Sequence, residues 1–348
     1  MLVKKMTSKE IARLAGVSVS TVSIILNGKP GVSEETRTRV MDILEQNGFS
    51  HNKRNPVALQ GGVIRFCKIA KHGQIVNDRH NVFISDYVDG IIEEAKLHCL
   101  SVEIETFNGF SIRAVAENTS ASHNLTGCII LATEFSAEDI DVFDTVGIPF
   151  VFLDAMYEFS QHDFITMDNI KMTYDMIHHF KELGHTKIGM LYGTGCSNFD
   201  QRKIAFVRAL SELNLPFRED WLFRLGSTHE TAQADMYGLI NGKKALPTAF
   251  FAANDMIAVG AIAALQSLGY RIPEDIAVGG FDDIPVASFI EPQLTTISVP
   301  KFDIGRLSVS VLLDRIKGRD TYLSRKSVLA GKLIMRQSTG SARKKDSI

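Results

Sequence analysis

Carboxylate and amide side chains follow several apolar, strand-like runs of this sequence, where they could bind a ligand. They stand at the ends of three runs: Asp154 after FVFL, Asn254-Asp255 after FFAA, and Asp282-Asp283 after VGGF. Open parallel sheets bind ligands at the carboxyl ends of their strands, so these side chains can meet at one cleft. Groups that donate and accept hydrogen bonds suit a ligand rich in hydroxyls.

Each of these residues also has a purely structural interpretation, because Asp and Asn after a strand are good helix N-caps. Asp255 heads the helical pattern DMIAVGAIAAL and is predicted to be its cap. The pair Asp168-Asn169 is predicted to be a cap or a crossover element.

Catalytic and metal-binding chemistry has little support in the sequence. The motifs GxxxxGK[ST], HExxH and GxSxG are absent, which argues against an enzyme. His178 and His179 are adjacent in a predicted helix, where neighbouring side chains point about 100° apart, so packing is favoured over a metal clamp. Four widely spaced cysteines, Cys67, Cys99, Cys128 and Cys196, predict reduced thiols. We therefore expect no cofactor and no metal.

The elements that position the polar residues alternate between strand and helix patterns from Val63 onward. The predicted strands are Val63–Ala70, Val102–Phe107, Gly127–Leu131, Phe150–Leu153, Phe164–Met167, Ile188–Leu191, Ala249–Ala252 and Ala277–Phe281. The predicted helices include Asp86–Leu97, Asn169–Leu183, Gln201–Leu213 and Asp255–Leu268. Repeated βαβ units form parallel sheets covered by helices, and this many strands indicate two lobes.

The first sixty residues follow a different pattern, with three short helices. Thr7 and Glu10 form a capping box, and Ile11, Leu14 and Ala15 fall on one face of the first helix. Gly16 then breaks the chain before a second helix. Such a helix-turn-helix presents the start of its second helix to DNA bases. The residues there are Ser18, Val19, Ser20, Thr21 and Ser23. A three-helix module that docks another protein remains the alternative.

Charge and composition fit a soluble protein with a basic head. The chain has 348 residues, 45% of them hydrophobic, and a net charge of -2. Residues 1–55 carry nine Lys/Arg against five Asp/Glu, so the remainder carries -6. This asymmetry is typical of a DNA-binding module joined to an acidic domain. The start, MLVKKMTSKEIARLAG, lacks the apolar stretch of a secretory signal, and no run is long enough for a membrane span. We expect a cytoplasmic protein without membrane contact.

The run SKEIARLAGVSVSTVSIILNGKPGVSEETRTRVMDILEQNGF resembles the DNA-binding head of the LacI/GalR family of bacterial regulators. The resemblance implies base readout by Val19 and Ser20. Thr21, Ser23 and Asn27 match positions that contact the DNA backbone or support the helix, and Thr7 is also expected to contact DNA. Ile24 replaces the arginine usual in the family, which reads guanine through two hydrogen bonds. The operator consensus is therefore expected to differ from the family norm.

The family continues with a hinge helix whose leucine wedges into the minor groove. Leu59 is the candidate here, although it lies one place beyond the usual position. Pro56 would have to begin the helix, which proline permits. A flexible linker without a wedge remains the alternative.

The body resembles the family's effector domain in segments such as GIPFVFLDA, HHFKELGHTKIGMLYG, PTAFFAANDMIAVGAIAALQSLGYRIPEDIAVGGFDD and EPQLTTISVP. The implied fold is α/β: an all-α helix-turn-helix head joined to a two-lobed periplasmic-binding-protein-like domain with Rossmann-like parallel sheets. The residues that match effector-contacting positions are Phe83, Asp154, Arg202, Asn254 and Asp282. Lys68, Lys71 and His72 depart from the family. If they face the cleft, an anionic effector is indicated; if they are solvated, they carry no information.

These patterns together predict the domain organisation. The expected parts are a head at 1–50, a hinge at 51–61, an effector-binding and dimerisation domain at 62–340 and a disordered tail at 341–348. Within the domain, one lobe is expected at 62–165 plus 299–328 and the other at 166–298 plus 329–340.

The resemblance implies a sequence-specific transcriptional regulator, a repressor, that binds double-stranded operator DNA. A small effector, a sugar or sugar derivative bound between the lobes, controls this binding. The short polar tail SARKKDSI has no leucine heptad, so we expect a homodimer rather than a tetramer. A periplasmic binding protein would share the body but would need a signal peptide and no basic head.

Overall fold

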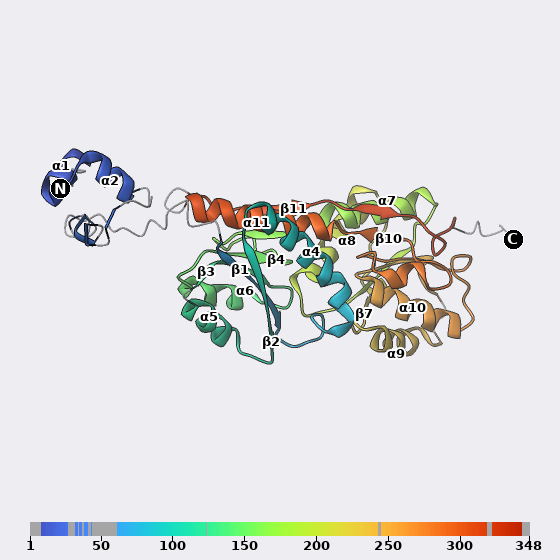
Figure 1. The fold of residues 1–348 in the computed structure, drawn as a ribbon. Helices are drawn as coiled ribbons and strands as arrows, with labels where there is room; N and C mark the ends of the chain where they lie inside the picture. The colour runs from blue at the N-terminus through green and yellow to red at the C-terminus, as the bar shows by residue number, and fades with distance from the viewer. Residues whose placement is uncertain are drawn as a thin grey trace. The chain divides into compact units, whose positions relative to one another are not determined.

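The computed structural model describes residues 8–26, 32–33, 35–36, 38–40, 43, 61–122, 124–242, 245–318 and 322–342. The chain forms two compact units. One comprises Met1–Gly62 with His98–Leu100, and the other comprises Val63–Leu97 with Ser101–Ile348. We call them the head and the body and describe each by itself (Figure 1).

The head contains α1 (Ser8–Ala15) and α2 (Val19–Leu26), joined by a tight turn at Gly16, whose φ is +66°. Ser18 caps α2, because its Oγ accepts a hydrogen bond from the backbone N–H of Thr21 at 3.0 Å. Residues 35–36, 38–40 and 43 are also helical. The buried core of the head consists of Ile11, Ala12, Ala15, Val22, Ile25 and Val40.

One prediction for the head is wrong. Leu14 was expected on the inner face of α1, but it is 53% exposed, and Ala12 is buried in its place. The buried side chains are therefore spaced i, i+1 and i+4, which turns the inner face of this short helix away from Leu14.

The N-lobe of the body is built on a six-stranded parallel sheet with the strand order β11-β5-β4-β3-β1-β2. Its strands are β1 (Val63–Ala70), β2 (Ser101–Asn108), β3 (Leu125–Leu131), β4 (Phe150–Leu153), β5 (Phe164–Met167) and β11 (Lys326–Leu329). Its helices are α4 (Asn81–Leu97), α5 (Ile112–Ala121), α6 (Ala137–Asp141) and α11 (Lys301–Gly318). The strands β3 and β4 are almost wholly buried, as expected when helices cover both faces of a parallel sheet.

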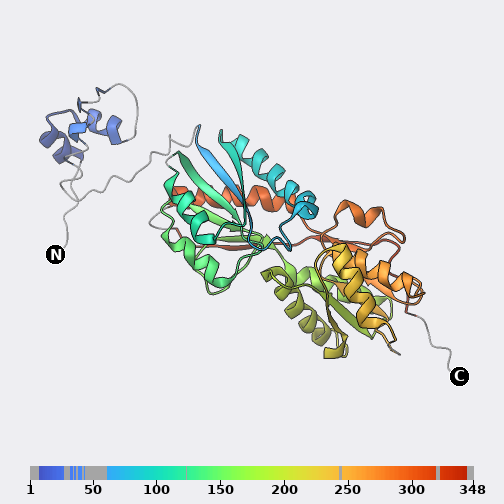
Figure 2. The ribbon, with the colours of Figure 1, turned by 90° about the horizontal axis from the view of Figure 1, so that it is seen from below.

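The C-lobe is built on a four-stranded parallel sheet with the order β7-β6-β8-β9. Its strands are β6 (Ile188–Tyr192), β7 (Leu222–Arg224), β8 (Ala249–Ala252) and β9 (Ala277–Gly279). Its helices are α7 (Asn169–Glu182), α8 (Ser197–Glu212), α9 (His229–Ile240) and α10 (Asp255–Ser267). In both ribbon views the two lobes lie end to end (Figures 1 and 2).

The chain passes between the lobes three times. The first passage follows β5, the second joins β10 (Thr296–Ser298) to α11, and the third joins β11 to β12 (Lys332–Ile334). The strands β10 and β12 pair in an antiparallel ladder of their own. The body is therefore the predicted two-lobed α/β fold, and each sheet directs the carboxyl ends of its strands toward the boundary between the lobes.

Two helices of the N-lobe, α4 and α11, cross at glycines. A Cβ added at Gly305 would overlap the backbone carbonyl of Tyr87, and one added at Gly90 would overlap that of Phe302. Backbone atoms cannot yield as a flexible side chain can. The short separation between these helices therefore depends on the absence of side chains at both positions.

We predict that Gly305→Ala lowers the free energy of unfolding by about 1–3 kcal/mol, the usual cost of overpacking. The matched control is Gly238→Ala in α9, where an added Cβ meets nothing within 4 Å. That variant should be more stable than wild type by about 0.5–1 kcal/mol, because alanine favours a helix interior. Urea unfolding measures both, and equal effects in the two variants would contradict the close crossing.

Candidate DNA-binding and effector sites

A cavity of about 440 Å³, counting its open mouth, lies where the two lobes of the body meet. All five residues predicted to contact an effector line it: Phe83, Asp154, Arg202, Asn254 and Asp282. The other lining residues are Ile75, Val76, His80, Ile84, Thr133, Cys196, Asn198 and Phe199. The structure thus brings together the five predicted residues, which span 199 positions of the sequence from Phe83 to Asp282.

Asp154 is the centre of the hydrogen-bond network on the N-lobe side. Its carboxylate accepts from the Thr133 hydroxyl at 2.6 Å and from the Tyr87 hydroxyl at 3.0 Å. Asn198 of α8 donates to the same carboxylate at 3.1 Å, which links the two lobes. Burial raises the pKa of Asp154 above its ordinary value, although these hydrogen bonds oppose the shift.

Arg202 is the cation of the cavity and is held by the C-lobe. Its Nε donates to the Asn169 side chain at 2.9 Å, and its Nη1 donates to the carbonyl of Ala253 at 2.5 Å. The guanidinium stacks on Phe281, 3.6 Å from the ring centroid. Its Nη2 lies 3.7 Å from the Asp282 carboxylate, a long ion pair between two buried groups.

Two cavity carboxylates have backbone conformations that residues other than glycine rarely adopt. Asp154 has a φ of +63° and Asp282 a φ of +117°. Such residues persist only where their surroundings hold them, and they cluster at ligand sites. The two strand ends therefore sacrifice some backbone stability to aim these carboxylates into the cavity.

The predicted cap of α10 is wrong by one residue. Asn254 is the N-cap, because its side chain accepts from the backbone N–H of Ile257 at 2.8 Å. Asp255 is the first helical residue and is buried, and its carboxylate accepts from Thr296 Oγ1 at 2.5 Å and from the Ile284 N–H at 2.9 Å. Asn254 thus combines a structural role with a place in the cavity wall. Asp168 does cap α7, through Lys171 N–H at 2.9 Å.

The expected charge of the effector depended on whether Lys68, Lys71 and His72 face the cavity. None of these three residues lines it. Lys68 Nζ donates to the Asn81 side chain, and Lys71 forms an ion pair with Asp139. His72 is not a lining residue either, and its Nε2 is 3.0 Å from the carbonyl oxygen of Gly195. Arg202 is therefore the single lysine or arginine in the described lining, and two carboxylates face it.

Several residues that line the cavity or, like Tyr87, bind its lining residues were missed by the sequence reasoning. Thr133 follows the predicted strand that ends at Leu131, so the strand-end argument could have found it. Tyr87 and Asn198 lie on helices, where nothing in their spacing distinguishes them from packing residues. Ile75, Val76 and His80 come from the segment where the chain departs from the family pattern.

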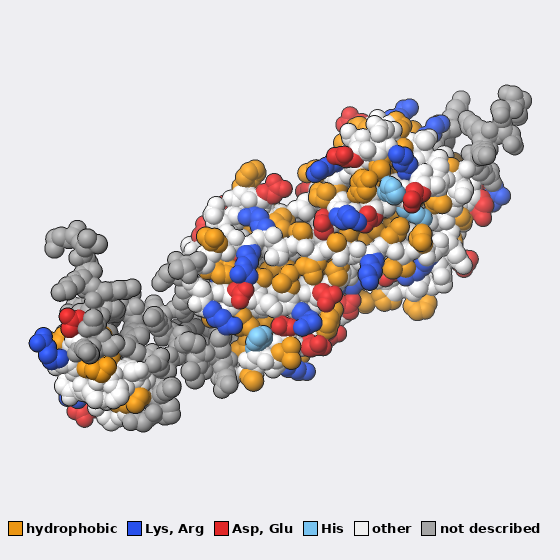
Figure 3. Space-filling model, turned by 90° about the horizontal axis from the view of Figure 1, so that it is seen from above, with side chains coloured by type: hydrophobic (Ala, Val, Ile, Leu, Met, Phe, Trp, Pro, Cys, Tyr) orange, Lys and Arg blue, Asp and Glu red, His pale blue; other side chains and the backbone are white. Residues whose placement is uncertain are grey.

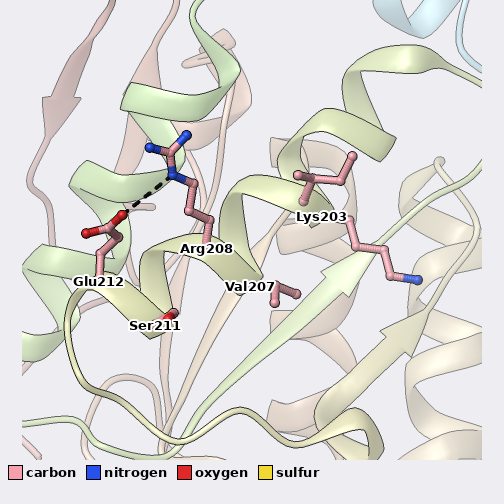
Figure 4. A pocket seen from close by; sticks show the side chains of 6 residues that line it. Lys203, Val207, Arg208, Ser211 and Glu212 are labelled. Atoms are coloured by element: carbon pink, nitrogen blue, oxygen red, sulfur yellow. Dashed lines mark ion pairs between the residues drawn. The ribbon is translucent and has the colours of Figure 1, made fainter.

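A second depression lies on the exposed face of α8 and is shown in Figure 4. Its lining residues are Lys203, Ile204, Val207, Arg208, Ser211 and Glu212. All of them come from one helix, so no second element encloses a ligand there. Arg208 and Glu212 form an i,i+4 ion pair of 3.7 Å, which is typical of a solvated helix face.

The described DNA-binding candidates of the head are grouped at the start of α2. Ser18, Val19, Ser20 and Ser23 are exposed, and Thr21 is half-buried. The Ser18 hydroxyl bonds those of Ser20 and Thr21 at 2.6 and 2.8 Å. Thr7, Asn27 and Leu59 were also predicted to contact DNA, and they lie outside the described residues.

Two general features of the described residues concern membrane-spanning helices and metal sites. Their helices include none that is long and apolar enough to cross a membrane. Among the same residues, no three His, Cys, Asp or Glu side chains are grouped as metal ligands would be.

We predict a pH dependence that arises from Asp282. Burial raises its pKa to about 7, although Arg202 and Lys301 oppose the shift. A carboxyl whose pKa is raised by folding contributes stability that is complete below its unfolded pKa of about 4 and is lost as the pH rises through about 7. Asp282→Asn lacks this titration, so its stability relative to wild type should increase from about pH 5 to about pH 8.

The control is Asp275→Asn, because Arg271 holds the pKa of that half-buried carboxyl below its ordinary value. Its stabilising ion pair is already complete above about pH 5, so the difference from wild type should stay constant over the same range. Urea midpoints at several pH values measure both differences. A constant difference for Asp282→Asn would show that Asp282 ionises normally.

Comparisons with known proteins agree with this architecture. The family model described as "Bacterial regulatory proteins, lacI family" matches residues 7–52, and the "Periplasmic binding protein-like domain" matches residues 177–339. The first match contains the exposed start of α2. The second contains Arg202, Asn254 and Asp282.

Curated relatives match along nearly the whole chain. The ribose operon repressor of Haemophilus influenzae is 30% identical over 337 residues, which cover 95% of this chain and 98% of the relative. The HTH-type transcriptional repressor PurR of Vibrio cholerae is 31% identical, covering 90% of this chain and 92% of the relative. These relatives are transcriptional repressors rather than enzymes.

Solved structures share the fold. A LacI family transcriptional regulator from Enterococcus faecium with bound ribose has a TM-score of 0.65 at 26% identity, over 81% of this chain and 100% of that chain. The lac repressor dimer bound to operator has a TM-score of 0.71 at 24% identity, over 97% and 100%. The chain belongs to the LacI family of bacterial regulatory proteins and is a DNA-binding transcriptional regulator.

Proposed function

We propose that this chain is a repressor whose affinity for its operator is set by an uncharged, hydroxyl-rich effector, a sugar or sugar derivative, in the cavity between the lobes. The observation that carries the proposal is the set of charges in that cavity. Asp154 and Asp282 contribute two carboxylates, and Arg202 contributes one guanidinium. All three side chains are buried and fixed by neighbours.

These charges favour a sugar over a sugar phosphate or a sugar acid. An anion entering the cavity would meet two carboxyl groups, and the only guanidinium in the described lining already faces one of them, so the anion would find no unpaired cation there. Burying an unpaired charge is costly, whereas hydroxyls can donate to the carboxylates and accept from Arg202 and Asn254. A relative is named a ribose operon repressor, and a family member was solved with ribose.

The head supplies the DNA contacts in this proposal. Val19 and Ser20 stand exposed at the start of α2, where the second helix of a helix-turn-helix meets base edges. Ser18, Thr21 and Ser23 carry hydroxyls that can bond phosphates or bases. On the body, basic and acidic side chains are interspersed on the face shown in Figure 3, which does not form a surface of one sign for DNA.

Two chains are proposed to pair through the body, so that two heads meet a two-fold symmetric operator. The N-lobe offers an edge for this pairing, because β2 ends the six-stranded sheet. Val82, Leu97 and Ile104 expose large apolar side chains on α4 and β2. A regulator of transcription works where the chromosome is, so the proposed location is the cytoplasm. For the domain organisation we keep the division proposed from the sequence: head 1–50, hinge 51–61 and effector domain 62–340.

We predict that D-ribose and other neutral sugars raise the thermal unfolding temperature, because a ligand that binds only the folded state stabilises it. D-Ribose 5-phosphate should give a smaller shift, because its phosphate meets the carboxylates. Arg202→Ala should abolish the shift, while Arg208→Ala on the outer face of α8 should respond as wild type does. The proposal of a neutral ligand fails if the phosphate ester gives the larger shift.

We predict that Ser20→Ala changes the base preferred at one operator position, at a cost of about 1–3 kcal/mol for the original duplex. The salt dependence of binding should stay the same, because phosphate contacts remain. Selection of duplexes from a random pool gives both preferences. Ser120→Ala on α5, an exposed serine of the body, is the control. An unchanged consensus for Ser20→Ala would remove this residue from the readout.

A further inference from the structure

The exposed face of α2 carries only aliphatic and hydroxyl side chains. Val19, Ser20 and Ser23 are exposed, and Ile24 is half-buried. Because successive residues of a helix are about 100° apart, these four positions occupy one continuous arc of about 140°. The buried residues of the helix lie on its other side. The surface that α2 offers to a DNA groove therefore has two serines in its centre and a branched aliphatic side chain at each margin.

The two aliphatic side chains of this arc contribute little to the described core of the head. Val19 is 44% exposed. The partly buried apolar residues that pack against the core are Val17, Val32 and Ile43, and neither Val19 nor Ile24 is among them. Single exposed apolar residues are common on protein surfaces and need no function. Here, however, the two flank the serines on the face that is proposed to meet bases, which points to a role in contact with DNA.

The chemical groups of α2 limit which features of a base it can recognise. Its sequence, VSTVSIIL, contains no guanidinium, ammonium, amide or carboxylate. It therefore lacks the side chains that read guanine or adenine through two hydrogen bonds, and those that accept from cytosine. Its hydroxyls both donate and accept, so they can bond to bases of several kinds.

The aliphatic side chains are more restrictive than the hydroxyls. A valine or isoleucine side chain can replace water only favourably at an apolar group, because a base edge that loses a hydrogen bond to water without replacement is destabilised. The methyl group of thymine is the apolar group that base pairs present in the major groove. Contact with it buries apolar surface on both partners, which is favourable.

We propose that α2 reads its operator through thymine methyl groups, with Val19 and Ile24 each contacting one methyl in the major groove. The two residues lie at opposite margins of the exposed arc, so they contact different thymines. This inference deepens the proposed function and rests on it, because α2 must meet base edges. It assigns to α2 a preference for A·T pairs in each half of the operator.

Replacement of thymine by uracil tests the proposal, because uracil differs from thymine only in lacking the methyl group. The probe is a duplex that the full-length protein selects from a random pool, remade with one thymine at a time replaced by uracil. Fluorescence anisotropy at one fixed salt concentration measures the affinities. At two thymines in each half of the duplex, the replacement should weaken binding about fourfold, the effect of burying one methyl group.

Variants of the protein identify the side chain that contacts each methyl. In Val19→Ala, one of the two uracil replacements should lose most of its effect, because the methyl has lost its partner. In Ile24→Ala, the other replacement should do so. Leu14→Ala is the matched control, because it shortens another aliphatic side chain of the head, 53% exposed on α1. It should retain both uracil effects at full size.

The possible results separate this inference from the proposed function. A selected duplex that tolerates uracil at every thymine would overturn the inference, while the protein would remain a sequence-specific regulator. Uracil effects that persist at full size in both Val19→Ala and Ile24→Ala would also overturn it, because other groups would then contact the methyls. Failure to select any duplex would contradict the proposed function, and this inference with it.

Discussion

The burial of Arg202 among the ends of both sheets is the interaction on which the rest of the body depends. A buried guanidinium needs partners, and this one has Asn169, the carbonyl of Ala253, the ring of Phe281 and the carboxylate of Asp282. Asp154 stands opposite and is bound by groups from both lobes. The residues at the strand ends need particular positions to satisfy these groups. This explains why two of these residues, Asp154 and Asp282, have strained backbones.

In the proposed function, the same cluster links ligand chemistry to conformation. A hydroxyl-rich ligand offers hydrogen-bond donors to two carboxylates and acceptors to one guanidinium. It therefore complements polar groups that otherwise interact with one another. The segment 71–80 adds Ile75 and Val76 to the lining and forms direct hydrogen bonds with the C-lobe through His72 and Gln74. The backbone carbonyl of Asp282 also accepts a hydrogen bond from Lys301 Nζ at 2.8 Å. This bond connects the cavity to the start of α11 in the N-lobe. A change in the cavity can therefore alter how the lobes meet.

Much of this arrangement could be predicted from the sequence, for physical reasons. The apolar runs of parallel strands are distinct, and the strand-end rule located Asp154, Asn254 and Asp282. Arg202 required the family resemblance, because an arginine inside an amphipathic helix is normally solvated. The place of Ile75 and Val76 in the lining could not be predicted, since their backbone is held by Glu134, a residue distant in sequence. The inner face of α1 was misjudged at Leu14, because the described core of the head is too small for periodicity to decide.

The central claim is that a neutral sugar bound at the buried cluster changes the affinity of the protein for DNA. The most direct test measures the affinity for a selected duplex with and without that sugar. The account predicts a change of roughly 5–150-fold for wild type, the usual range of coupling between sites. It also predicts no change for Arg202→Ala. Unaltered duplex affinity in wild type, at sugar concentrations that saturate its thermal shift, would contradict the account.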